Sequence, residues 1–270
     1  MKKLAHAVIL AGRRPEGDPV ADAYRVPFKA LVTSGSRLLI EHVCDSLKRS
    51  GHVQAMTVML QNPSALTSRP ELADYNLKGI KSGASISKNI ALAMDTLHDQ
   101  FPLLITTGDH PLLLPEHIST FITAAEESDA DIVIGFATRD TVMTAYPETQ
   151  RTWLQFSDVT VTGCNLFYIR NAKTRKVFEV WQEMEKDRKQ AMKIAWKFGP
   201  LFFILMLMKW ISLPKALARL ARPFDIKIEP VLLPFADTAI DADKISDMEL
   251  IAAILTKREV LAMLAEDDDD

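Results

Sequence analysis

Short apolar runs alternate with segments of helical periodicity along most of this chain, and this alternation constrains the fold more than any other feature. Four runs have the length and apolar content of buried strands: 5–11, 54–60, 102–108 and 131–136. Segments with apolar residues at helical spacing lie between or after them: 38–51, 85–99 and 115–128. The residues that begin or end helices stand where these segments need them: Gly51, Ser85 and Pro115. The alternation predicts an α/β fold, a mostly parallel, twisted, Rossmann-like sheet with helices on both faces.

The alternation stops between residues 171 and 222, where helical segments follow one another with no strand between them. A strand at 225–234 and a final helix at 244–264 then resume it. We therefore expect a single domain over 1–265 with a helical insertion at 171–222 near its C-terminal part. Residues 266–270 are all acidic and form a separate tail.

The insertion is basic and partly apolar. From Arg170 to Arg222 it holds thirteen Lys and Arg against four acids, and residues 201–208 form an uninterrupted apolar run. Three interpretations stay open. The helices pad the domain or form a homodimer surface, they touch an anionic membrane peripherally through 196–222, or they form a lid whose cations hold a phosphorylated acceptor.

Composition narrows the class of protein. Apolar residues make up 48% of the chain, which suits a buried core, and two cysteines are too few for a disulfide framework. We therefore expect a cytoplasmic protein, with contact at the inner face of the membrane as the peripheral alternative.

No stretch has the roughly 20 apolar residues of a membrane span. The basic residues lack interleaved aromatics at stacking spacing, so no nucleic-acid partner is expected.

The first candidate site follows the first predicted strand. That strand ends in Leu10-Ala11-Gly12 and delivers backbone N–H groups to the edge of the sheet, where they can meet a base or a phosphate. Arg13 and Arg14 follow directly, and Lys29 returns in the segment VPFKAL. Fixed positive charges of this kind suit a polyphosphate. The alternative is a surface loop with solvated arginines.

The second candidate site is acidic. Asp109 comes directly after a buried strand, where a carboxylate can hold a hard cation such as Mg²⁺ beside phosphates, although Asp-x-Pro sequences also favour turns. Asp241 and Asp243 alternate along a stretch expected to be extended, so both side chains would point the same way and complete the site. A solvated strand end is the alternative. His110 is either a ligand or a packed side chain, and Asp247 is expected in the first turn of the last helix.

Five motifs, in this order, resemble one family. AVILAG with PFKAL and LLIEHV, then SGASISKNIALAM, LLITTGDHPLL, TGCNLFYI and AIDADKISDMELI, look like the MobA-like NTP transferases, which are nucleotidyltransferases of glycosyltransferase-A-like fold. The resemblance covers nearly the whole chain except the helical insertion. Two details depart from the family: the first loop keeps only Gly12 and Gly17, and Lys244 and Ile245 stand where threonine and proline are common. The first departure leaves open which of Arg13, Arg14 and Arg25 acts as the family's loop arginine.

The resemblance implies a role for each matching residue. Leu10, Ala11, Gly12 and the loop arginines would meet the nucleotide, Lys29 its triphosphate, and Ser85 and Ser87 the nucleoside. Asp109 would bind Mg²⁺ together with Asp241 or Asp243. Asn165 would face the acceptor, and Arg151, which leads into the same strand, is either an acceptor-phosphate contact or a structural arginine.

The expected activity is Mg²⁺-dependent transfer of a nucleoside monophosphate from an NTP, CTP or GTP before the others, to a small phosphorylated acceptor, with release of pyrophosphate. Two other functions stay open. A glycosyltransferase of the same fold would use a nucleotide-sugar donor, but no Asp-x-Asp follows a central strand. A non-catalytic nucleotide-binding protein is the third reading, favoured by the degenerate glycine pattern of the first loop.

Overall fold

The computed structural model describes residues 3–13, 17–83, 85–186 and 208–267. The strands of the main sheet are β1 (Ala5–Leu10), β4 (Val53–Leu60), β5 (Lys78–Lys81), β6 (Leu103–Thr107), β7 (Ile132–Thr138), β8 (Leu154–Gln155), β9 (Thr160–Ile169) and β10 (Ile228–Leu233). A separate small ribbon pairs β2 (Thr33–Ser34) with β3 (Arg37–Leu38). The four strands predicted first, in 5–11, 54–60, 102–108 and 131–136, are all present to within two residues at each end.

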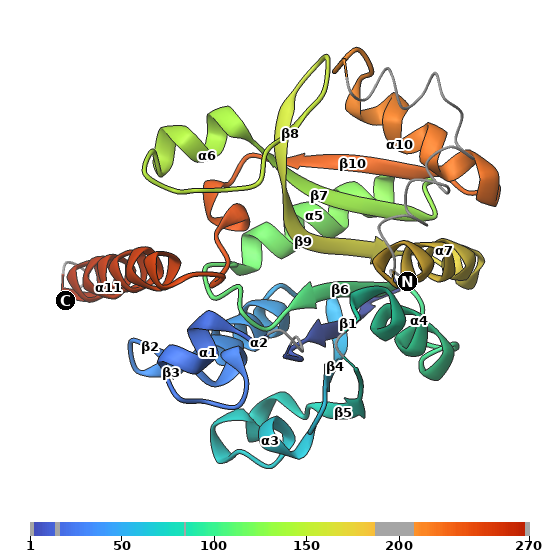
Figure 1. Cartoon of the computed structure of the whole chain (residues 1–270). Coiled ribbons are helices and arrows are strands. Elements are labelled where there is room, and N and C mark those ends of the chain that lie inside the picture. Colours follow the sequence, from blue (N-terminus) through green and yellow to red (C-terminus); the bar gives the residue numbers. More distant parts are fainter. Residues whose placement is uncertain (1–2, 14–16, 84, 187–207, 268–270) are drawn as a thin grey trace.

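The described residues form one eight-stranded sheet in the order β10-β7-β9-β6-β1-β4-β5, with β8 paired to β9. Neighbours are parallel except for β9, which runs antiparallel to both β6 and β7 (Figure 1). The sheet is therefore mostly parallel, as the alternation predicted. Because β9 runs the other way, its middle and first half reach the edge at which the parallel strands end.

Helices cover both faces of the sheet. Their bounds are α1 (Pro19–Ala23), α2 (Leu39–Arg49), α3 (Ser64–Thr67), α4 (Ile86–Thr96), α5 (Pro115–Glu127), α6 (Arg139–Ala145), α7 (Arg175–Lys186), α10 (Leu213–Ala221) and α11 (Ile245–Asp267). Short 3₁₀ turns lie at Lys29–Leu31, Pro70–Tyr75, Ala172–Thr174, Arg222–Phe224 and Ala236–Ala239. The side chains of Ala7 and Ile9 pack with α2, α5 and the first half of α11, whereas that of Val8 packs with α4, α7 and α10. This alternation is the period of two expected for a strand buried on both faces.

The caps that the sequence predicted are present. Ser85 accepts a hydrogen bond from the backbone N of Lys88 at the start of α4, and Pro115 occupies the first turn of α5. Gly51, one residue past the C-cap of α2, has φ of +71°, a left-handed conformation that glycine adopts without strain.

The predicted helical insertion is only partly described. Residues 172–186 and 208–224 contain α7, α10 and two 3₁₀ turns and no strand, in agreement with the prediction, while 187–207 lie outside the described residues. Residues 196–207, which include all of the apolar run except Met208, fall in that gap. Membrane contact, dimerisation and the lid therefore all stay predictions, as does the single domain over 1–265. Among the described residues, no helix is both long and apolar enough to cross a bilayer.

Candidate active site

Strands β1, β4, β5 and β6 are parallel, so their carboxyl ends lie along the same edge of the sheet. The loops that follow these ends carry most of the predicted site. In the register of the sheet, Leu10 stands beside Met59 of β4 and Thr107 of β6, so the chain leaves all three strands at the same level. The approach is close at Gly108, where an added Cβ would lie 3.2 Å from Cβ of Ala11 and 3.3 Å from Cβ of Ala30. Ligands bind α/β sheets at such an edge.

One side of this edge is built from backbone, and we call residues 10–13 and 82–83 the backbone rim. Two amide side chains hold it. Gln61, directly after β4, accepts from the backbone N of Arg13 at 3.0 Å and donates to its carbonyl oxygen at 2.7 Å. Asn89 of α4 makes the equivalent pair with Gly83, at 3.1 and 2.9 Å.

The sequence analysis did not find Gln61 or Asn89. Both are ordinary residues on predicted elements, and their partners lie 48 and 6 positions away. The available signals were weak: Gln61 directly follows a predicted strand, and Asn89 lies within the motif SGASISKNIALAM. An amide that donates and accepts at once can fix a loop without adding charge.

The predicted nucleotide residues lie along the backbone rim or beside it. Leu10 is half-buried, Ala11 is buried and Gly12 is exposed, so the rim opens to solvent at the glycine. Ser85 and Ser87 lie at the start of α4, with 3.2 Å between their hydroxyl oxygens. The Arg13 guanidinium pairs with Asp22, and Arg25 is exposed. Arg14 lies outside the described residues.

The other side of the edge is charged, and we call Lys29, Asp109, Asp241, Asp243, Arg151 and Asp247 the charged rim. The Lys29 ammonium lies 2.5 Å from Oδ2 of Asp109 and 3.0 Å from Oδ1 of Asp243. Carboxylate oxygens of Asp109, Asp241 and Asp243 all lie within 4.8 Å of one another. The structure thus brings together three segments that are far apart in sequence. A backbone hydrogen bond of 2.9 Å from Ala242 to Asp109 fastens two of them.

The sequence analysis expected Asp241 and Asp243 to lie along an extended stretch, and the structure differs. The segment is a tight turn, in which the backbone N of Asp243 donates to the carbonyl oxygen of Asp241 at 3.1 Å. Both carboxylates nevertheless approach Asp109, because the turn wraps around it. His110 is packed: it is buried, and burial lowers its pKa to about 4.

The charged rim holds more acidic side chains than basic ones, and this imbalance shifts the pKa values of its members. Burial alone would raise the pKa of Asp109, but the Lys29 ammonium outweighs it and the pKa is lowered, so this carboxyl is ionised. Burial would likewise lower the pKa of Lys29, but Asp109 and Asp243 raise it well above its usual value. Burial, followed by the charges of Asp109 and Asp243, raises the pKa of Asp241 to about 7, against the opposing effect of Arg151 and Lys29. The acids outnumber the cations that contact them.

The donor set fits a hard divalent cation. Carboxylate oxygens are the ligands that Mg²⁺ prefers, usually one or two of them with the remaining positions left to water and substrate phosphates. Oδ1 of Asp109 is buried and has no hydrogen-bond partner among the described residues, which is costly for a charged group unless a cation or water meets it. The exposed side of Asp243 leaves the cluster open to solvent and substrate.

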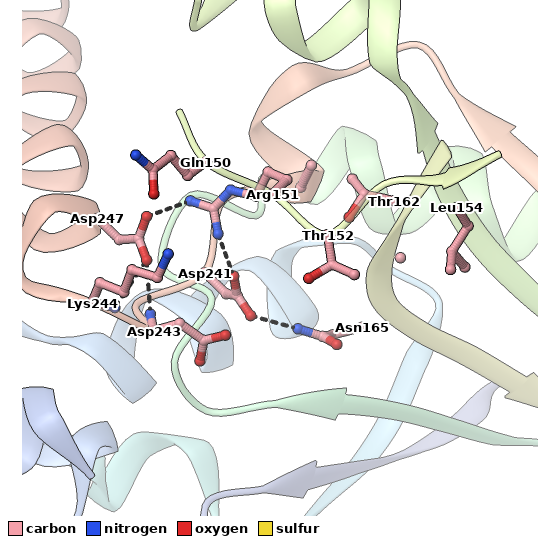
Figure 2. A pocket seen from close by; sticks show the side chains of 12 residues that line it. Gln150, Arg151, Thr152, Leu154, Thr162, Asn165, Asp241, Asp243, Lys244 and Asp247 are labelled. Atoms are coloured by element: carbon pink, nitrogen blue, oxygen red, sulfur yellow. Dashed lines mark hydrogen bonds and ion pairs between the residues drawn. The ribbon is translucent and has the colours of Figure 1, made fainter. Parts of the chain in front are cut away.

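Next to the acids lies a pocket of about 500 Å³ (Figure 2). Its lining comes from β8 and the segment before it, from β9, and from the stretch 239–247 that leads into α11. The lining residues are Gln150, Arg151, Thr152, Leu154, Thr162, Gly163, Asn165, Ala239, Asp241, Asp243, Lys244 and Asp247. Asn165, which has a positive φ of 52°, donates to Oδ2 of Asp241 at 3.0 Å. Arg151 and Asn165, the two predicted acceptor residues, therefore both line this pocket.

Arg151 and Asp247 form contacts that the sequence analysis had not predicted. Figure 2 shows the Arg151 guanidinium between two carboxylates, 2.8 Å from Asp241 and 2.6 Å from Asp247. Asp247 lies in the first turn of α11, as expected, and also accepts from the backbone N of Asp243 and of Lys244. The sequence could not reveal these ion pairs, because Arg151 lies 90 residues from Asp241 and 96 from Asp247.

Comparison with known proteins identifies the fold. A hypothetical transferase from Thermus thermophilus has 22% sequence identity and a TM-score of 0.73, with 91% of this chain and 99% of that one covered. CMP:2-keto-3-deoxy-manno-octonic acid synthetase complexed with CTP has 14% identity and a TM-score of 0.57, with 96% and 100% covered. The 4-diphosphocytidyl-2C-methyl-D-erythritol synthase from Anaerococcus prevotii has 15% identity and a TM-score of 0.55, with 94% and 97% covered.

No curated protein matches the sequence. The family model of the MobA-like NTP transferase domain matches residues 7–195, which is most of the chain and includes the backbone rim, Lys29, Asp109 and Asn165. The resemblance to this family is thereby confirmed, with four of the five motifs inside the matched residues and AIDADKISDMELI beyond them. The protein belongs to the MobA-like NTP transferase family and is a nucleotidyltransferase by class.

Proposed function

We propose that this nucleotidyltransferase moves a nucleoside monophosphate from an NTP to a small phosphorylated acceptor, with Mg²⁺, and releases pyrophosphate. One observation carries the proposal: the Lys29 ammonium lies against Asp109 and Asp243, and Asp243 also lines the pocket beside β9. A triphosphate bound along the backbone rim would reach this amine, and an acceptor in the pocket would approach from the other side.

The roles of the residues follow from that arrangement. The backbone at Leu10–Gly12 and the hydroxyls of Ser85 and Ser87 would surround the nucleoside. Lys29 would contact the β- and γ-phosphates, and Arg13 would support it once released from Asp22. Asp109, with Asp241 or Asp243, would hold Mg²⁺, which when bound neutralises charge on the phosphates. Asn165 would face the acceptor.

The reaction needs no nucleophilic side chain. A phosphate oxygen of the acceptor forms the new bond to the α-phosphorus, the bond between the α-phosphorus and its bridging oxygen breaks, and pyrophosphate leaves with that electron pair. The protein supplies in-line positioning and stabilises the charge that develops on the leaving group. Lys29 is the residue best placed for the second task. Neither cysteine is suited to covalent catalysis, because both are buried and burial raises their thiol pKa values.

CTP is the first nucleotide to test and GTP the second. One structural neighbour was solved in complex with CTP, and another is named for a diphosphocytidyl product. The amide and backbone contacts of the backbone rim suit either base.

A pyrophosphate-release screen tests the proposal. CTP, GTP, UTP and ATP would each be combined with pooled phosphorylated alcohols, sugars and cofactors, in the presence and absence of Mg²⁺. With an active pair in hand, Lys29→Ala and Asp109→Ala should each lower turnover on the order of 10²- to 10³-fold while the fold survives. The first removes a positive charge from the phosphates of the leaving group, and the second removes a ligand of Mg²⁺.

Lys257→Ala and Asp74→Ala are matched controls, because both residues are exposed and neither belongs to the charged rim or lines the pocket beside it. Near wild-type turnover of Lys29→Ala or Asp109→Ala would contradict the site assignment. Activity with a nucleotide-sugar donor and none with any NTP would replace the proposed reaction with glycosyl transfer.

A further inference from the structure

Arg151 lies in the segment between α6 and β8, at the wall of the pocket beside the acids. A cation at that place invites the interpretation that it binds the phosphate of the acceptor. Its contacts indicate another role. Only 7% of its side chain is exposed, and each nitrogen of the guanidinium has a partner: Nη1 donates to Asp241, Nη2 to Asp247 and Nε to the hydroxyl of Thr149.

Binding an acceptor phosphate would require Arg151 to leave these carboxylates. Asp247 has 6% of its side chain exposed and Asp241 has 17%. A nearly buried carboxylate that loses its counter-ion is strongly destabilised, more so than a solvated one. The arginine is therefore committed to the two acids, and its planar fork matches both at once.

Through these two acids Arg151 fixes the whole loop 241–247. It orients Asp241 directly through Oδ1, while Asn165 holds Oδ2 of the same carboxylate at 3.0 Å. It orients Asp247, which in turn accepts from the backbone N of Asp243 and Lys244 at 3.2 and 2.9 Å. Figure 2 shows this chain of contacts running from Asp247 through Arg151 and Asp241 to Asn165.

We propose that Arg151 is a positioning residue for the divalent-cation site: it fixes the carboxylate of Asp241 and, through Asp247, the backbone of Asp243, and it does not bind the acceptor. This inference rests on the proposed function, because it assumes that Asp109 and its neighbours hold the cation. Partners that orient metal-binding carboxylates typically contribute roughly 10- to 100-fold to metal affinity.

The test measures Mn²⁺ binding directly, by the electron paramagnetic resonance signal of free Mn²⁺, on the full chain without substrate. Arg151→Met should weaken Mn²⁺ binding roughly 10- to 100-fold. It should also raise the Mg²⁺ concentration needed for half-maximal turnover by a similar factor, while the acceptor KM at saturating Mg²⁺ stays within about threefold. Arg151→Lys, which keeps the charge but cannot span both acids, should fall between wild type and Arg151→Met.

Two further variants separate positioning from loss of folding. Arg170→Met removes another half-buried arginine, one that donates to the carbonyl oxygens of Ala125, Ser128 and Ala130 and does not line the pocket beside the acids. It should lower the melting temperature and leave Mn²⁺ binding unchanged. Arg151→Met combined with Asp247→Asn removes a cation and an anion together, so it should fold at least as well as Arg151→Met and still bind Mn²⁺ weakly.

The outcomes are distinct. Wild-type Mn²⁺ affinity in a folded Arg151→Met protein, together with a raised acceptor KM, would overturn the inference and return Arg151 to the acceptor site. Wild-type protein that binds no Mn²⁺, or Mn²⁺ binding that survives Asp109→Asn, would overturn the proposed cation site itself, and this inference with it.

Discussion

The two rims of the candidate site are held together by different kinds of contact. The backbone rim is held by neutral amides, Gln61 and Asn89, each of which donates and accepts one hydrogen bond. The charged rim is held by ion pairs of Lys29 and Arg151 with four acids. Neutral hydrogen bonds therefore fix the shape of one rim, whereas the charged side chains of the site are gathered in the other. Substitutions in the backbone rim should change how well a nucleotide fits, and those in the charged rim should change stability, cation affinity and turnover.

The largest effect of these substitutions should come from Asp241, and Asp243, in the same turn, should contribute much less to stability. Asp241→Ala leaves Arg151 with one acidic partner, a loss of up to about 3 kcal/mol of unfolding free energy. Relief of the repulsion from Asp109 and Asp243, which raises the pKa of Asp241 to about 7, offsets part of that loss. Turnover should fall on the order of 10²-fold. Asp243→Ala should lower the unfolding free energy by at most about 1 kcal/mol, because the Asp243 side chain is 52% exposed. Urea denaturation and pyrophosphate release would measure both. Equal losses of stability would break the distinction between a buried and a solvated acid.

A medium effect is expected from Gln61→Ala. This change removes both hydrogen bonds that hold Arg13, a loss of about 1–2 kcal/mol. If the loop serves nucleotide fit, the KM for the NTP should rise roughly 5- to 30-fold, with kcat nearly unchanged. Steady-state kinetics at saturating acceptor would measure the split. Asn62→Ala, at the neighbouring exposed residue, should leave both constants as they are. A fall in kcat without a change in KM would show that this rim also acts on charge.

The smallest effects should distinguish two glycines of the backbone rim. A Cβ at Gly12 would stand 3.3 Å from Oε1 of Gln61, so Gly12→Ala should displace that amide and raise the NTP KM a few-fold. A Cβ at Gly83 would meet nothing within 4 Å, and Gly83→Ala should change unfolding free energy by no more than about 0.5 kcal/mol. Thermal unfolding and NTP kinetics would compare them. A larger defect in Gly83→Ala would show that space at this position serves the bound nucleotide.

Much of the fold follows from local pattern, because long buried strands and amphipathic helices leave a strong periodic signal. The elements that were missed are short or weakly patterned, such as β5 (KGIK), β8 and α6. The reversed direction of β9 has no local signal at all, since it depends on which strands lie on either side.

Within the candidate site, too, the sequence revealed some residues and contacts and not others. Asp109 was found because it follows a buried strand, whereas Lys29 and Asp243 were found as charges in loops suited to phosphate and to a cation. The structure brings all three into contact. The extended conformation of 241–243 was a wrong prediction, since the turn is set by its packing around Asp109. The commitment of Arg151 to two acids could not be read from sequence, because a lone arginine offers no sign of its distant partners.

The place of β9 in the sheet has a consequence for how the protein is made. Strand β9 pairs with β6 on one side and β7 on the other, and β7 has β10 as its other neighbour. A chain emerging from the ribosome can therefore join β5, β4, β1 and β6 early, but β6 keeps an open edge and β7 has no partner until residue 169 has appeared. Open strand edges invite pairing with other chains. Truncated products that end before β9 should for this reason be a poor source of soluble protein.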